Sequence, residues 1–331
     1  MQARQITLAS RPVGMPTAET FGSRVVELAP PGDGEVLVRW LFLSVDPYMR
    51  GRMNAARSYV PPFEVGEPLV GSAVGEVVES RSAAFAAGDL VMSMASWSDY
   101  EVKPVHSLRR VEPAEGVSAS AYLGVLGMPG FTAYIGLTRF GEPKAGEVLF
   151  VSGAAGAVGS TVGQIAKLMG LKVIGSAGGP AKAARLGELG FDVGIDYRSG
   201  DIVYLLAEAA PDGIDVYVGN VGGSHLIAAL EASRDYARFV MCGSISGYNS
   251  KAREPGPWNL FRVVQRRLTL RGFIVSDHGS AIGEFTEKMS GWIRAGEVKY
   301  DETIVKGLEN APEAFLGLFS GANLGKMVVE L

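Results

Sequence analysis

Apolar and polar positions follow two different rhythms along the chain. Up to about residue 120, short apolar runs alternate with turn residues, and the pattern predicts strands within 34–44, 74–78, 88–92 and 100–102. Pro-Pro pairs at 30–31 and 61–62 interrupt these runs, and no helix-length pattern with a period of 3.6 residues appears before Ser118. The first third of the chain is therefore expected to be a mostly β module.

From about residue 140 the rhythm becomes apolar run, glycine, helical stretch. Continuous apolar runs that alternate with helices are typical of a parallel sheet covered on both faces, so the fold class predicted here is α/β with a doubly wound Rossmann sheet. The tail 300–331 returns to short strands and is expected to rejoin the first module, which predicts domains at 1–122, 123–298 and 299–331. Strands are expected at 148–152, 172–175, 193–196, 214–218, 238–242 and 326–331, and helices at 160–169, 181–189, 225–232 and 281–295.

A glycine-rich loop, Gly153-Ala-Ala-Gly156-Ala-Val-Gly159-Ser160, joins the first of these strands to the first helix. Glycines at this place let the backbone approach a pyrophosphate, and the helix N-terminus offers N–H groups and the positive end of its dipole. The alternative is an ordinary turn between a strand and a helix. The strand and helix on either side favour a dinucleotide site.

The end of the second strand decides which dinucleotide is expected. An NAD site carries Asp or Glu about 20 residues after the loop, where it binds the ribose 2′-hydroxyl. The stretch after Val173 and Ile174 has no carboxylate before Lys182, whose charge suits a 2′-phosphate. Tyr197 is a second candidate for that phosphate, or a cap on a strand end, and Lys182 is otherwise a solvated surface lysine. The predicted cofactor is NADP(H).

Composition and charge narrow the partners. Among 331 residues there are 31 Lys plus Arg and 35 Asp plus Glu, a formal net charge of −4, which disfavours nucleic acid and anionic membranes. The uncharged stretches 116–138 and 148–166 are interrupted by Pro129 or by glycines and are not expected to span a membrane. With the single cysteine Cys242 and no signal peptide at the start, a cytoplasmic location is expected.

Metal, hydrolase and nucleotide-hydrolysis motifs are missing from the sequence. His106, His225 and His278 are scattered, and Cys242 stands alone, so no metal site is predicted. No Gly-x-Ser-x-Gly elbow or phosphate-binding Gly-Lys-Ser/Thr loop occurs. The basic stretch 262–271 fits a helix followed by a strand rather than a nucleic-acid patch.

Four motifs carry a family resemblance that runs over essentially the whole chain. The sequence resembles the zinc-independent medium-chain dehydrogenase/reductases, in the leukotriene B4 dehydrogenase/prostaglandin reductase group with plant double-bond reductases and bacterial curcumin reductase. The string Asp-Pro-Tyr-Met-Arg at 46–50 is specific to this group, whereas the glycine loop is more widely shared. The motifs are 43–53 (Leu-Ser-Val-Asp-Pro-Tyr-Met-Arg-Gly-Arg-Met), 127–134 (Gly-Met-Pro-Gly-Phe-Thr-Ala-Tyr), the loop at 153–160, and 242–249 (Cys-Gly-Ser-Ile-Ser-Gly-Tyr-Asn).

The resemblance implies a GroES-like β module joined to the nucleotide domain, an active site in the cleft and a homodimer. It also explains the missing metal ligands, because the zinc-ligand positions of relatives fall in 43–46 and 70–76, which lack Cys and His. One departure is Gly219, where the family usually has an acidic residue before Asn220. Carried over by position, the cofactor residues are Gly156, Ala157, Val158, Gly159, Lys182, Tyr197, Asn220, Cys242, Gly243, Ser244, Ile245, Tyr248, Phe273, Ile274, Val275 and Asn323.

The expected reaction is NADPH-dependent reduction of the carbon–carbon double bond of an α,β-unsaturated ketone or aldehyde. Without a metal, a phenol hydroxyl together with the cofactor ribose hydroxyl is expected to stabilise the enolate oxygen. Tyr248 is the expected donor and Tyr48 lines the pocket opposite it; either could instead be a packed aromatic. Substrate choice is expected to lie in the loops 54–63 and 248–258. NADPH-dependent quinone reduction and non-catalytic NADPH binding are the alternatives.

Overall fold

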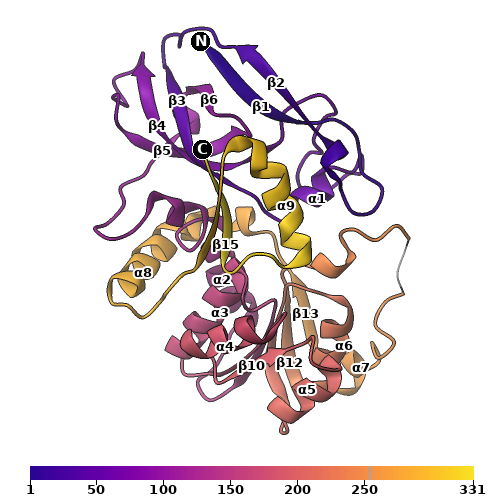
Figure 1. Ribbon diagram of the computed structural model, residues 1–331. Coiled ribbons are helices and arrows are strands. Elements are labelled where there is room, and N and C mark those ends of the chain that lie inside the picture. The colour runs from indigo at the N-terminus through magenta and orange to yellow at the C-terminus, as the bar shows by residue number, and fades with distance from the viewer. Residues whose placement is uncertain (253–254) are drawn as a thin grey trace. The chain divides into compact units, whose positions relative to one another are not determined.

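The chain folds into two units, and the chain crosses from one to the other at 123/124 and again at 301/302. The computed structural model describes residues 1–252 and 255–331 (Figure 1). We call residues 1–123 with 302–331 the β unit and residues 124–301 the α/β unit. The predicted domain boundaries, 122/123 and 298/299, fall close to these crossings. In the described ranges, no helix is long and apolar enough to cross a membrane.

The β unit is built on a mixed sheet in which the C-terminal strands join the N-terminal ones. The described strands run in the order β14-β15-β3-β4-β5-β7, with β6 also paired to β3. A separate antiparallel pair, β1 with β2, completes the β structure. Its strands are β1 (Gln2–Leu8), β2 (Phe21–Glu27), β3 (Glu35–Ser44), β4 (Val70–Ser80), β5 (Leu90–Ser96), β6 (Tyr100–Pro104), β7 (Arg109–Arg110), β14 (Glu302–Lys306) and β15 (Lys326–Glu330). Its helices are α1 (Met49–Arg52), α9 (Ala311–Ser320), and the short 3-10 turns η1 (Ala18–Thr20), η2 (Val105–Ser107), η3 (Ala119–Leu123) and η7 (Leu308–Asn310).

The β unit has its own aromatic core. Trp97 lies parallel to Phe21 and edge-on to Phe315, with ring centroids 6.4 and 6.3 Å apart. Phe315 comes from α9, whose inward positions recur with the helical period, so the C-terminal helix is packed into the same core as the N-terminal strands. The mostly β module expected from the sequence is confirmed.

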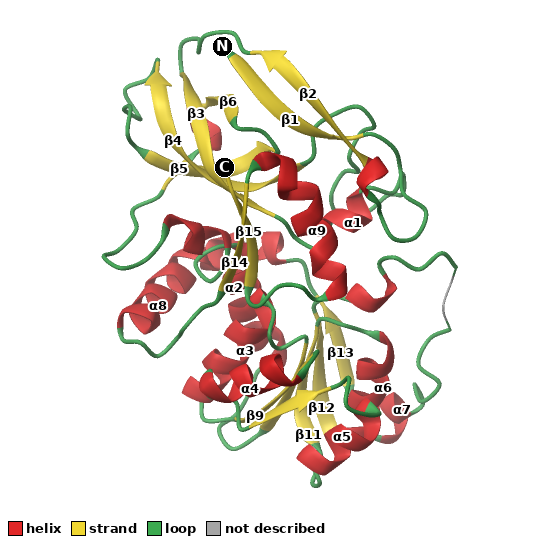
Figure 2. Ribbon diagram, in the orientation of Figure 1, coloured by secondary structure: helices red, strands yellow, loops and turns green. Residues whose placement is uncertain are grey.

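The α/β unit contains a parallel sheet in the order β10-β9-β8-β11-β12-β13. Every residue of β8 is buried, as expected of a central strand covered on both faces. In Figure 2, α3 and α4 lie on one side of the strands and α5, α6 and α7 on the other. The strands are β8 (Val148–Ser152), β9 (Lys172–Ala177), β10 (Val193–Asp196), β11 (Ile214–Gly219), β12 (Ser233–Met241) and β13 (Thr269–Gly272). The helices are α2 (Met128–Ile135), the π-helix η4 (Gly136–Gly141), α3 (Ala157–Leu168), α4 (Pro180–Glu188), α5 (Ile202–Ala209), α6 (Gly223–Ala232), η5 (Ile245–Gly247), α7 (Arg262–Gln265), η6 (Val275–Ala281) and α8 (Ile282–Arg294).

This strand order confirms the doubly wound α/β fold. The sequence runs outward from β8 to β9 and β10, and then restarts on the other side of β8 with β11. The reversal places a topological switch point between β8 and β11, which is where open α/β sheets bind ligands at the carboxyl ends of their strands.

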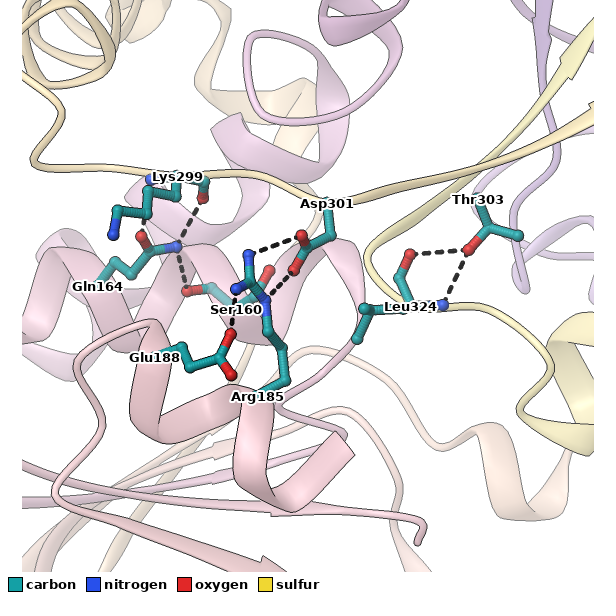
Figure 3. A network of polar contacts seen from close by, with 8 residues as sticks. All are labelled: Ser160, Gln164, Arg185, Glu188, Lys299, Asp301, Thr303 and Leu324. Carbon is teal, nitrogen blue, oxygen red and sulfur yellow. Dashed lines mark hydrogen bonds and ion pairs between the residues drawn. The ribbon is translucent and has the colours of Figure 1, made fainter. Parts of the chain in front are cut away.

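The last residues of the α/β unit are held by hydrogen bonds and an ion pair to α3 and α4 (Figure 3). The Gln164 side chain exchanges two hydrogen bonds of 2.8 Å with the backbone of Lys299. Arg185 binds both carboxylate oxygens of Asp301, at 2.8 and 3.0 Å, and this bidentate arrangement is the most directional that an ion pair can have. These contacts hold the backbone at 299–301 against α3 and α4, where the chain leaves the α/β unit.

Candidate nucleotide and active site

The glycine loop after β8 has the geometry that close backbone approach requires. Gly153 adopts a positive φ of 63°, and Gly156 caps α3. A Cβ on Gly159 would lie 2.4 Å from the Gly153 carbonyl oxygen and 2.8 Å from Cα of Ala154. Both are backbone atoms, so no larger residue fits without moving the loop. The first N–H groups of α3 have no partners within the helix, and they include those of Ala157 and Val158.

A second corner forms where β9 and β10 end. The Asp196 carboxylate accepts the N–H groups of Gly179 and Arg198, at 2.8 and 2.9 Å, and so joins the two strand ends. A Cβ on Gly178 would lie 2.8 Å from the Tyr197 hydroxyl and 3.1 Å from Nε of Arg198. Tyr197 and Arg198 therefore both lie over the turn that leads to Lys182.

Two cations share this corner. Burial, and secondly the positive charge of Arg198, lower the pKa of Lys182 from its ordinary value. Arg198 was not among the residues expected from the sequence, although it directly follows Tyr197. The Tyr197 ring stands edge-on to His225, 5.0 Å away, and burial lowers the pKa of His225 to about 4, so this histidine is neutral. The corner is therefore positive through Lys182 and Arg198.

The switch point is organised by Ser152, the last residue of β8. Its hydroxyl accepts the N–H groups of Asn220 and Val221, at 3.0 and 3.3 Å, and its carbonyl accepts Nδ2 of Asn220 at 2.8 Å. A Cβ at Gly219 would lie 2.8 Å from the ring of Tyr217, whose hydroxyl is 3.1 Å from that of Ser152. The glycine that departs from the family pattern thus leaves room for Tyr217, and the Asn220 turn keeps its hydrogen bonds.

The loop after β12 is hydrogen-bonded to the turn at 219–220. The N–H groups of Cys242 and Gly243 both donate to the Gly219 carbonyl at 2.9 Å. Ile245 donates its N–H to the Asn220 carbonyl at 3.2 Å. Burial raises the pKa of the Cys242 thiol to about 12, so it is protonated at neutral pH.

The Tyr248 side chain is hydrogen-bonded to the backbone of its own loop. Its hydroxyl oxygen accepts the Ser244 N–H at 3.3 Å and would lie 3.2 Å from a Cβ on Gly243. Burial is the main cause that raises the pKa of Tyr248, which keeps the phenol protonated at neutral pH. With its oxygen already accepting a hydrogen bond from the backbone, the hydroxyl proton is available for donation to another acceptor.

The remaining candidates of the α/β unit follow β13. The Phe273 ring stacks on Phe140 at 4.9 Å and fills the space beside Gly136. Its side chain therefore has a packing role, and a contribution to cofactor binding would come from its backbone. Ile274 caps the short helix η6, and Val275 is its first residue.

Tyr48 and Asn323 are the two candidates that lie in the β unit. Tyr48 precedes α1 and packs against the core of this unit; burial, and then the charge of Asp46, raise its pKa. Asn323 donates Nδ2 to the Gly325 carbonyl at 2.8 Å. Of the two loops expected to set substrate choice, 54–63 is described, whereas residues 253 and 254 of 248–258 lie outside the described residues.

Comparison with known proteins places the chain in a family. Residues 4–111 match the model for the N-terminal domain of oxidoreductase, and residues 157–293 match the model for zinc-binding dehydrogenase. Within the ranges that the structure covers, no three His, Cys, Asp or Glu residues group so that they could hold a metal ion. The expectation of a metal-independent activity stays a prediction.

Full-length relatives define the family more closely. The chain is 45% identical to the NADPH-dependent curcumin reductase of Escherichia coli, covering 99% of this chain and 96% of that one. It is 41% identical to the NADP(+)-dependent 2-alkenal reductase of Nicotiana tabacum, covering 98% and 96%. The crystal structure of CurA from Vibrio vulnificus in complex with NADPH matches with a TM-score of 0.94 and 43% identity, covering 99% and 98%. The resemblance inferred from the sequence motifs is confirmed: the chain belongs to the zinc-independent medium-chain dehydrogenase/reductases, in the group of the curcumin and 2-alkenal reductases.

Proposed function

We propose that this oxidoreductase uses NADPH to reduce the carbon–carbon double bond of α,β-unsaturated ketones and aldehydes. The observation that carries the proposal is the protonated Tyr248 hydroxyl, held by the Ser244 N–H in a loop that is bonded to the switch point of a parallel sheet. The named activities of the E. coli and tobacco relatives support it. The cofactor is NADP(H).

The residues of the α/β unit fit this cofactor. The Gly156–Gly159 backbone suits a pyrophosphate, because the N–H groups at the start of α3 can donate to it. Gly159 allows the close packing of this turn, since a side chain there would collide with the loop. Lys182, Tyr197 and Arg198 would hold the 2′-phosphate. When bound, NADPH supplies the hydride that adds to the β-carbon of the substrate.

Tyr248 would act on the oxygen of the substrate. As the hydride arrives, negative charge develops on the carbonyl oxygen, and a donor placed in advance stabilises that charge more than it stabilises the neutral ketone. The Tyr248 phenol keeps its proton and donates a hydrogen bond to this oxygen. Tyr48, whose pKa is also raised, would line the substrate site, and solvent supplies the proton for the α-carbon.

A panel of acceptors tests the proposal. NADPH consumption would be followed with benzylideneacetone as an enone, cinnamaldehyde as an enal and menadione as a quinone, and the products would be identified. We expect the saturated ketone and aldehyde with the double bond reduced. Reduction of the quinone without the enones would favour quinone reductase, and NADPH binding without any turnover would favour a non-catalytic protein; either result overturns the proposal.

A further inference from the structure

A buried ion pair in the β unit is used by none of the steps above. Nζ of Lys326 lies 3.1 Å from Oδ1 of Asp46, and the two side chains are 4% and 8% exposed. Lys and Asp are rarely buried to this degree unless they are paired, because each loses its hydration. Lys326 begins β15 and Asp46 follows β3, so the pair joins the C-terminal segment of the β unit to its N-terminal segment.

The pair is fully satisfied by hydrogen bonds. An ammonium group has three donors, and Lys326 places them on the carbonyls of Val45 and Met327, both at 2.8 Å, and on Asp46. The second oxygen of Asp46 accepts the hydroxyl of Ser44. Lys326 therefore binds the turn 44–46 through a backbone carbonyl and a carboxylate, while the same carboxylate binds Ser44.

Tyr48 follows this turn with little freedom. Pro47 fixes its own φ and keeps Asp46 in an extended conformation. The Asp46 carbonyl accepts the Met49 N–H at 3.1 Å, and the Tyr48 carbonyl accepts the Gly51 N–H at 3.0 Å. These two hydrogen bonds form the start of α1. A displacement of Asp46 would therefore move Tyr48.

The other partner of the pair holds the segment with Asn323. Asn323 binds the carbonyl of Gly325, the residue before Lys326, which has a positive φ of 65°. Leu324 is fixed on both sides of its peptide by the hydroxyl of Thr303, with two hydrogen bonds of 2.9 Å (Figure 3). The Asn323 segment is thus anchored at Thr303 and at Lys326.

We propose that the Asp46–Lys326 pair is a positioning device that sets Tyr48 and Asn323 relative to each other. The inference rests on the proposed function, which places Tyr48 at the substrate, and on the family resemblance, which implies that Asn323 binds the cofactor. A buried ion pair is weak evidence for stability, because apolar replacements of both partners are often tolerated, so position is the better account of why two charges lie here. Lys326 and Asp46 act through Tyr48 and Asn323 and touch no reacting atom.

The test separates position from stability. Lys326→Met alone would leave the Asp46 carboxylate buried without its cation and is expected to fold poorly. The double variant Asp46→Asn with Lys326→Met removes both charges. A matched control is Glu147→Gln with Arg238→Met, which removes an ion pair of the α/β unit whose side chains are 20% and 19% exposed. The two double variants would be compared at equal fractions folded, judged by thermal unfolding.

We expect the Asp46/Lys326 double variant to lose about tenfold or more in kcat on benzylideneacetone with NADPH saturating, since small displacements of a positioned group are costly. The control should keep its kcat. Tyr48→Phe should lower kcat in the wild-type background and add nothing in the double variant, because the phenol is already misplaced. Independent, multiplying losses would overturn the proposal, as would an unchanged kcat in the double variant or in Tyr48→Phe.

A measurement that needs no turnover keeps the inference separate from the proposed function. The Cζ NMR signal of Tyr48, assigned with Tyr48→Phe in carbon-labelled protein, should broaden or split in the Asp46/Lys326 variant. The exposed Tyr204 in the α/β unit is the internal control and should not change. If the wild type reduces no enone or enal, the proposed function fails. A single sharp Tyr48 signal in the Asp46/Lys326 variant would by itself reject the positioning role.

Discussion

At the scale of single residues, the proposed function gives Lys182 and Arg198 the task of discriminating between NADPH and NADH. Arg198 lies over the turn at Gly178 and its charge acts on Lys182, while Oδ1 of Asp196 accepts two backbone N–H groups. An NAD site carries a carboxylate for the ribose 2′-hydroxyl, whereas two cations meet at this corner. The corner therefore favours a phosphate.

Lys182→Ala should weaken NADPH binding by about tenfold while hardly changing NADH binding. A charge-assisted hydrogen bond contributes about 1.5–3 kcal/mol, and the lower end applies because Arg198 remains. Dissociation constants from fluorescence titration would check this, with the exposed Lys172→Ala on β9 as the control. An equal loss for both cofactors would remove Lys182 from the phosphate site.

Tyr248→Phe deletes one oxygen and keeps the ring. We expect kcat on enones to fall about tenfold to a hundredfold, less than the full effect of one oxyanion donor because the ribose hydroxyl remains. NADPH affinity and the melting temperature should stay close to those of the wild type. The matched control is Tyr204→Phe, whose ring is exposed on α5. Wild-type turnover in Tyr248→Phe, with hydride transfer shown to be rate-limiting, would leave Tyr248 as a packed aromatic.

At the scale of elements, the sequence was most informative where the hydrophobic period was undisturbed. β8 occupies the predicted range 148–152, because a central strand is apolar at successive positions and is bounded by glycine or polar residues. The edge strand β10 also matches its predicted range, 193–196. β1 was not predicted: Gln5 and Thr7 are buried within it, and these polar residues hide its alternation. Oε1 of Gln5 accepts a hydrogen bond from Nε of Arg24 at 2.8 Å, a contact that only the folded pair of strands supplies.

A missed helix and a missed ion pair show two further limits. α9 buries Ala311, Ala314, Phe315 and Leu318, a helical pattern inside a tail for which the sequence analysis expects only short strands. The Asp46–Lys326 pair carries no local signal at all. Each residue reads as a surface charge at the end of a strand, and only the pairing of β15 with β3 brings the two ends together.

The start of α3 gives a prediction at this scale. In Gly159→Ala the new methyl group would collide with the backbone of Gly153 and Ala154, so the loop must shift. We expect a loss of about 1–3 kcal/mol in stability and at least tenfold weaker NADPH binding, since the displaced N–H groups would no longer suit a pyrophosphate. Gly187→Ala on α4 is the control, because nothing lies within 4 Å of its Cβ, and it should be neutral or slightly stabilising. Unchanged NADPH affinity in Gly159→Ala would show that the loop does not bind the cofactor.

At the scale of the whole molecule, a partly buried carboxyl group where the chain re-enters the β unit makes stability depend on pH. Burial raises the pKa of Glu302 above its ordinary value of 4.5, although Ser120 donates to it at 2.7 Å and the charge of Lys326 acts in the opposite direction. The native state therefore holds this proton more tightly than the unfolded state. Its stabilising contribution is complete below pH 4.5 and is lost as the pH rises through the raised pKa.

Glu302→Gln should remove that part of the pH dependence. The variant is expected to gain stability relative to the wild type as the pH rises from 4.5 toward neutrality, and to differ least at the acid end. Thermal midpoints measured across this range would check it, with the exposed Glu79→Gln on β4 as the control. Parallel curves for Glu302→Gln and the wild type would contradict the assignment.

The donor groups of the whole chain also predict how the enzyme responds to chelation. The Cys242 thiol has a pKa raised to about 12, which disfavours the thiolate that a metal needs, and His225 is buried against Tyr197. In the β unit, the buried carboxylate of Asp46 is already paired with the ammonium of Lys326. A divalent cation there would have to displace a buried, fully hydrogen-bonded charge. We therefore expect enone reduction to continue at its full rate after exhaustive dialysis against EDTA and 1,10-phenanthroline, with no zinc found in stoichiometric amount. One zinc per chain, lost together with activity and restored by adding zinc, would contradict this and would place the oxyanion stabilisation on the metal instead of on Tyr248.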